Sequence, residues 1–162
     1  MKQKITPCLW FDDKAEEAVR FYASVFKDAQ IGTITHYDNE SAKVSGMPEG
    51  SVLTVAFRLF GQEFLALNGG PVFTFTPAVS FVVNCEAQEE IDGFWEKLSA
   101  VKEAEQCGWL QDKYGVSWQI VPTVLNEMLS DPDRAKAQRA MSAMLEMKKL
   151  DIGKLKEAYE GK

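Results

Sequence analysis

The chain repeats one order of secondary structure twice, and this repetition constrains its fold more than any other sequence feature. Apolar residues at helical spacing predict helices at 14–26 and 88–98. Alternating segments predict strands around each helix, so that both halves read β-α-β-β-β. A shift of 73 residues, from Ala18 to Ile91, superimposes the two helices. We therefore expect a single α+β domain spanning 1–162 and built from two similar modules.

The first module, about 1–70, and the second, about 78–122, differ in their loops. Residues 38–50 are rich in Gly, Ser, Pro and Asn and predict an exposed loop that the second module lacks. The predicted strands of the first module are 5–11, 31–37, 51–59 and 62–68. Those of the second are 79–85, a weak strand at 102–106, 108–111 and 117–121.

Residues 123–162 change to a helical pattern and predict a C-terminal helical tail. Asp131-Pro132-Asp133 is typical of a helix start with proline in the first turn. Asp151 is typical of the residue that caps the start of a last short helix. Met141, Met144 and Met147 form a stripe that we expect to pack onto the sheet or across a dimer.

Composition restricts the partners of the chain. Its 162 residues are 46% hydrophobic, which is enough for one good core. The 18 basic and 24 acidic residues give a net charge of −6, which disfavours nucleic acid and anionic membrane surfaces. The start of the chain lacks the apolar run of a signal peptide, and no segment reaches the length of a membrane span. We therefore expect a cytoplasmic protein.

The cysteines and the single histidine carry no recognisable site. Cys8, Cys85 and Cys107 are an odd number without C-x-x-C spacing, which favours free and mostly buried thiols. Cys85 as a reactive thiol is the alternative, but it has no partnered base in the sequence. His36 lies on a predicted strand, where a surface or hydrogen-bonded role is expected.

Residues 107–122 read as a β-hairpin with a turn at Lys113-Tyr114-Gly115. Together with other segments, they resemble a known family. The segments 5–11 and 15–22 resemble the opening of vicinal-oxygen-chelate proteins, the group of glyoxalase I, bleomycin-resistance proteins and extradiol dioxygenases. The segments 48–50, 67–71, 106–109, 118–122 and 147–151 are similar to the PhnB-like branch, which carries the label 3-demethylubiquinone-9 3-methyltransferase.

The resemblance implies that the two modules form a cupped mixed sheet around a cleft, in a homodimer. Metal-using members of the superfamily place four ligands there. In this chain those positions fall on Pro7, Asn68, Ser80 and Gln119. These side chains lack the imidazole or negative charge that a divalent transition metal prefers. We therefore expect no metal and no cofactor.

Strand alternation selects the side chains that line this cleft. Together they form a mainly apolar pocket with a few polar groups, which suits a small, partly aromatic molecule. The alternative is that the polar members satisfy one another inside a small barrel. The candidate ligand-binding residues are Pro7, Leu9, Phe11, Phe64, Asn68, Ser80, Asn84, Ser117 and Gln119.

These features favour a metal-independent binder of a small molecule with no assignable reaction. A metal-dependent enzyme of the glyoxalase or dioxygenase type is one alternative. Methyl transfer, as the family label says, is the second. A methyltransferase of the usual doubly wound kind has a glycine-rich turn after its first strand, whereas this chain has Asp12-Asp13-Lys14.

Overall fold

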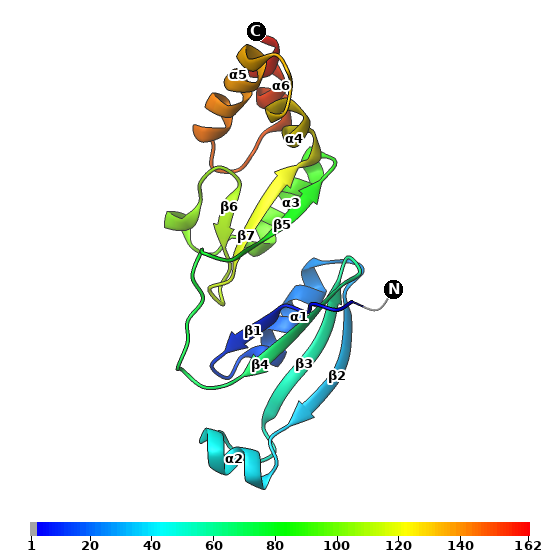
Figure 1. The fold of residues 1–162 in the computed structure, drawn as a ribbon, viewed down its shortest axis with the longest axis vertical. Coiled ribbons are helices and arrows are strands. Elements are labelled where there is room, and N and C mark those ends of the chain that lie inside the picture. Colours follow the sequence, from blue (N-terminus) through cyan, green and yellow to red (C-terminus); the bar gives the residue numbers. More distant parts are fainter. Residues whose placement is uncertain (1–2) are drawn as a thin grey trace. The chain divides into compact units, whose positions relative to one another are not determined.

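The computed structural model describes residues 3–162, which divide into two compact units between Phe75 and Thr76. Each unit contains a mixed β-sheet with a helix packed on it, so the expected α+β class is confirmed (Figure 1). The sheets have four and three strands. Within residues 3–162, no helix combines the length and apolar character needed to cross a membrane.

The first unit has the sheet order β1-β4-β3-β2, with β1 parallel to β4 and the other neighbours antiparallel. Helix α1 packs on this sheet through buried Ala18, Val19 and Tyr22. The elements are β1 (Cys8–Phe11), α1 (Ala15–Val25), β2 (Gln30–His36), α2 (Asn39–Ser45), β3 (Val52–Leu59) and β4 (Gln62–Asn68).

The second unit has the sheet order β5-β7-β6, with β5 parallel and β6 antiparallel to β7. Helix α3 packs on this sheet and buries Ile91, Trp95 and Leu98. The elements are β5 (Ser80–Cys85), α3 (Gln88–Leu98), the 3-10 helix η1 (Lys102–Ala104), β6 (Trp109–Gln111) and β7 (Ser117–Pro122).

Two predicted segments adopt a different structure. The weak strand expected at 102–106 is a 3-10 helix, because the Glu105 carboxylate accepts hydrogen bonds from Ser99 and Lys102 and holds the chain in a compact turn. The expected loop at 38–50 contains α2. Asp38 and Ser41 form a capping box at its start, and Gly46 ends it with a φ of 75°. Every residue of α2 is exposed or half-buried, so this helix has no buried apolar face. The sequence therefore carries no apolar periodicity from which the helix could be predicted.

The predicted hairpin between β6 and β7 is confirmed, and a buried carboxylate organises it. Asp112 is 1% exposed, and it accepts hydrogen bonds from the backbone amides of Tyr114 and Val116 and from the indole of Trp118. Gly115 takes a φ of 89°, which favours glycine. The turn is therefore set by a side chain that the sequence pattern did not single out.

The C-terminal tail is helical, as expected, with α4 (Thr123–Leu129), α5 (Arg134–Leu145) and α6 (Ile152–Glu160). It has a core of its own, to which Met144 and Met147 contribute, whereas Met141 is exposed. Asp151 caps α6, as predicted. The N-cap of α5 is Asp133, so Pro132 precedes the helix instead of lying in its first turn. The buried core of the tail consists of Leu125, Met128, Ala140, Leu150 and Leu155.

Candidate functional site

The sheet of the second unit has one face covered by α3 and one open face. Val83, Cys85 and Ile120 are buried on the covered face. Side chains alternate along a strand, and the register pairs Ser80 with Ser117 and Val82 with Gln119. The predicted residues Ser80, Asn84, Ser117 and Gln119 therefore share the open face, as expected.

Two of these polar residues satisfy each other. The Gln119 side-chain amide donates a hydrogen bond of 2.9 Å to the hydroxyl of Ser80. Ser117 is buried, while Asn84 is exposed. Ser80 and Gln119 therefore follow the alternative prediction, in which polar side chains of the cleft form hydrogen bonds with each other.

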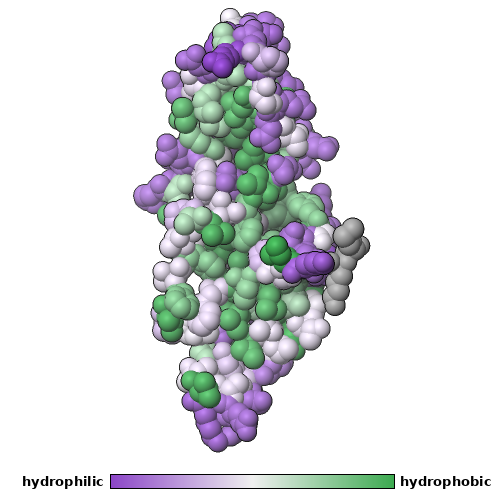
Figure 2. All heavy atoms as spheres, in the orientation of Figure 1, coloured by the Kyte–Doolittle hydropathy of each residue, from purple (hydrophilic) through white to green (hydrophobic). Residues whose placement is uncertain are grey.

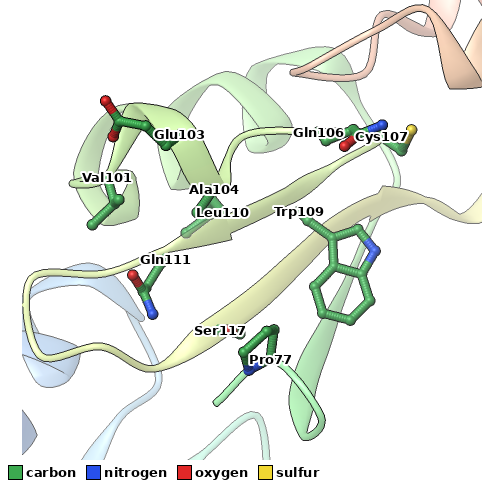
Figure 3. Close-up of a pocket in the computed structure, with 10 residues that line it drawn as sticks. All are labelled: Pro77, Val101, Glu103, Ala104, Gln106, Cys107, Trp109, Leu110, Gln111 and Ser117. Carbon is green, nitrogen blue, oxygen red and sulfur yellow. The ribbon is translucent and has the colours of Figure 1, made fainter. Parts of the chain in front are cut away.

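A pocket of about 600 Å³ lies beside β6 in this unit (Figure 3). The register pairs Trp109 with Gln119 and Gln111 with Ser117, so Trp109 and Gln111 project onto the open face. Of the predicted site residues, all of which the structure describes, Ser117 alone lines this pocket. The lining consists of Pro77, Val101, Glu103, Ala104, Gln106, Cys107, Trp109, Leu110, Gln111 and Ser117.

Trp109 and Gln111 were missed because the site prediction used the first and last strand of each module and left out the short strand β6. The signal was present in the sequence. Once the hairpin turn at 113–115 is placed, antiparallel pairing puts Trp109 and Gln111 on the same face as Gln119 and Ser117. Counting across the turn would therefore have found both residues.

In the first unit, the predicted residues lie on the face that α1 covers. The backbone N–H of Ala15 donates to Oδ1 of Asn68 at 2.7 Å, and Nδ2 of Asn68 donates to the carbonyl of Val52 at 3.0 Å. The ring of Phe64 stacks on Phe57, which in turn stacks on Tyr22 of α1. The expectation that this face is open is therefore wrong.

Of the remaining predicted residues of the first unit, Leu9 and Phe11 follow the same pattern. Leu9 pairs with Ala66 and Phe11 pairs with Asn68, so both belong to the covered face, and both are buried. Pro7 precedes β1 and is half-buried, and its carbonyl accepts a hydrogen bond from the amide of Leu65. Asn68 thus holds the start of α1, and Leu9, Phe11 and Phe64 belong to the core.

For Leu9 and Phe11 on β1, the error has a simple physical cause in the length of one connection. Three residues, 12–14, join β1 to α1, whereas two residues, 86–87, join β5 to α3. The helices therefore correspond by a shift of 73, but the strands before them correspond by 74. Because the side-chain period of a strand is two, carrying the helix shift into the strand exchanges its faces.

The open face of the first unit carries Cys8 and Trp10 instead. Trp10 packs against Gly69, where a Cβ atom would lie 2.1 Å from the indole ring, and its Nε1 donates to the carbonyl of Gly70. A second pocket, of about 540 Å³, lies on this unit, and Arg58 and Glu63, which form an ion pair, are among the residues that line it.

The four positions implied for metal ligands do not fit a divalent transition metal. The oxygen and the nitrogen of the Asn68 side-chain amide both form hydrogen bonds with backbone groups, and the Ser80 hydroxyl is hydrogen-bonded to Gln119. Pro7 has no donor atom in its side chain. Within residues 3–162, no three His, Cys, Asp or Glu side chains come together, and His36 is exposed on β2.

The sequence pattern of a family described as 3-demethylubiquinone-9 3-methyltransferase matches residues 3–121. The chain belongs to this family. A solved structure titled putative 3-demethylubiquinone-9 3-methyltransferase, PhnB protein, from Bacillus cereus is 41% identical, covers 75% of this chain and 100% of its own, and has a TM-score of 0.62. The predicted similarity to PhnB-like proteins is thereby confirmed.

Two further structures are more distant from this PhnB-like chain. Protein PA1353 from Pseudomonas aeruginosa is 15% identical, covers 75% of this chain and 98% of its own, and has a TM-score of 0.55, so it supports the fold alone. Lactoylglutathione lyase from Agrobacterium tumefaciens is 16% identical, covers 77% of this chain and 96% of its own, and has a TM-score of 0.44. No curated protein matches the chain.

Exchanging two asparagines separates structural from exposed site candidates. Asn68→Ala removes one buried and one part-buried hydrogen bond, to the amide of Ala15 and the carbonyl of Val52, so we expect it to lower the free energy of unfolding by about 2 kcal/mol. Asn84→Ala, on the open face, is the matched control and should change it by less than about 0.5 kcal/mol. Urea unfolding followed by circular dichroism measures both, and equal losses would contradict the assignment.

Cys85 should be inert in the folded PhnB-like protein. Burial, with the nearby Glu90 carboxylate as a smaller cause, raises the pKa of its thiol to about 12. At pH 8 the reactive thiolate is therefore almost absent. We expect mass spectrometry to find no carbamidomethyl group on Cys85 after iodoacetamide treatment of native protein, and full modification in guanidinium chloride. Comparable labelling in both states would disprove this assignment.

Proposed function

We propose that this protein binds a small, partly aromatic molecule in the pocket beside β6, without a metal ion. The observation that carries the proposal is the placement of the Trp109 indole and the Gln111 amide around a pocket of about 600 Å³. Small-molecule sites usually have volumes of roughly 300–1,000 Å³ and combine apolar walls with a few polar groups.

The chemistry of the lining narrows the class of ligand. The indole of Trp109 offers a flat apolar surface on which a ring can stack. Gln106, Gln111 and Ser117 supply polar atoms that can orient a ligand. Glu103 also lines the pocket and the chain has a net charge of −6, so a neutral or cationic molecule is favoured over an anion.

The two alternatives make different demands on the residues. A metal-dependent enzyme of the glyoxalase or dioxygenase type needs charged or imidazole ligands, which the implied positions do not supply. A methyltransferase of the doubly wound kind needs a parallel sheet and a glycine-rich first turn. Each sheet here contains antiparallel neighbours, and Asp12-Asp13-Lys14 follows β1.

Nile red, a neutral aromatic dye, tests the proposed site. In protein labelled with 5-fluorotryptophan, we expect the dye to shift the ¹⁹F resonance of Trp109 and to leave buried Trp95 unchanged. Trp109→Ala should weaken binding about tenfold, since it removes the stacking surface. Trp10→Phe, in the other unit, is the control. Undiminished affinity of Trp109→Ala, or a dye response at other tryptophans alone, would refute the site.

Two further measurements separate this proposal from its alternatives. Protein purified without chelator or affinity metal should contain less than stoichiometric zinc, nickel, manganese and iron by elemental analysis. Calorimetry with S-adenosylmethionine should give no saturable heat. A tightly held metal would favour the metalloenzyme alternative, and saturable binding of S-adenosylmethionine would restore methyl transfer.

We also propose that the protein acts in the cytoplasm as a homodimer. Apolar surface, drawn in green in Figure 2, supports self-association. Val72, Phe73, Val79 and Val82 are each more than half exposed. Light scattering coupled to size-exclusion chromatography should give twice the chain mass of 18.2 kDa. A monomer at micromolar concentration, with or without Nile red, would rule out this assembly.

A further inference from the structure

The connection between α5 and α6 binds the turn that precedes β6. We call residues 146–151 the strap. The family match ends at Val121, so the strap and the helices around it lie beyond the matched segment, and the similarity expected at 147–151 is not part of that match. The turn consists of Gln106-Cys107-Gly108-Trp109, and three of its residues, Gln106, Cys107 and Trp109, line the pocket.

The turn has a conformation that needs support. The amide of Trp109 donates to the carbonyl of Gln106 at 2.8 Å, and the amide of Gln106 donates to the carbonyl of Trp109 at 3.2 Å. Cys107 and Gly108 take φ values of 51° and 85°, as in a type I′ turn. Glycine and asparagine tolerate this left-handed region, but a cysteine in it is strained.

The strap supplies partners for both central amides of this turn. The amide of Cys107 donates to the carbonyl of Met147, and the amide of Gly108 donates to the carbonyl of Lys148, each at 2.8 Å. Leu150, which is fully buried, lies where a Cβ atom on Gly108 would be 3.0 Å from its side chain. Two consecutive carbonyls thus match two consecutive amides, in close contact.

The strap is held from its other side by α3. The side-chain amide of Gln88 donates to the carbonyl of Leu150 at 3.1 Å, and its Oε1 accepts from the amide of Ile152 at 2.9 Å. Lys149 also forms an ion pair with Asp92. One side chain of α3 therefore holds the C-terminal end of the strap, just beyond the two carbonyls that bind the turn.

We propose that the strap positions Trp109 in the ligand pocket, and that Gln88 is the positioning residue that holds the strap. This inference rests on the proposed function for its effect on binding. Without the clamp, the strap carbonyls leave the two amides, the strained turn relaxes, and the indole loses its fixed orientation. The lost preorganisation weakens the binding of a ligand that stacks on it.

Gln88→Ala tests the clamp in the full chain. We expect amide hydrogen exchange at Cys107 and Gly108 to become at least about tenfold faster, while exchange in β3 of the other unit stays unchanged. The ¹⁹F resonance of Trp109 should shift or broaden without a change at Trp10. The Kd for Nile red should rise about fivefold. Gln138→Ala, an exposed glutamine on α5, is the matched control and should leave all three readouts unchanged.

The readouts distinguish the possible failures. Unchanged exchange at Cys107 and Gly108 would overturn the clamp. Faster exchange with an unchanged Trp109 resonance and Kd would overturn the positioning role and leave the proposed site intact. If the unmodified protein does not bind Nile red, the proposed function fails, while exchange and the Trp109 resonance still decide the clamp. If the alanine variant does not fold, Gln88→Glu replaces it, because a glutamate keeps the acceptor for the amide of Ile152 and loses the donor to the carbonyl of Leu150. This variant should change the same three readouts in the same direction, but by less.

Discussion

Each sheet of this protein has one face covered by a helix, and this contact decides which side chains remain for binding. In the first unit the contact includes the Asn68 side chain, which bridges the start of α1 and the carbonyl of Val52. The stacked rings of Tyr22, Phe57 and Phe64 continue it. Because strand side chains alternate, burial of these residues places Cys8 and Trp10 on the open face.

The second unit uses the same arrangement, and its open face leads to the candidate site. Trp109 and Gln111 reach the pocket through the antiparallel pairing of β6 with β7. That pairing depends on the Asp112 carboxylate, which holds the hairpin turn, at one end and on the strap at the other. The short strand β6 is thus fixed at both ends, which suits a site that needs a fixed aromatic surface.

Much of the fold could be predicted because long amphipathic segments carry clear periodicity. The boundaries of α3 and β4 were predicted residue for residue, and the hairpin at 113–115 is confirmed. Helix α2 and the 3-10 helix at 102–104 were missed because side-chain hydrogen bonds, rather than apolar patterns, form them. In the site, Ser80 and Gln119 were placed on the correct face, whereas Leu9, Phe11, Phe64 and Asn68 were placed on the wrong one.

The sequence by itself determined the duplicated α+β plan, the family, and the neutral character of the four positions implied for metal ligands. These properties follow from local periodicity and residue identity. The tertiary structure decided which face of the first sheet is open, because the β1 to α1 connection is one residue longer than the β5 to α3 connection, which exchanges the faces of β1 relative to β5. It also decided that the tail contacts the turn beside the pocket, since hydrogen bonds between Cys107 or Gly108 and residues about 40 positions away leave no local pattern.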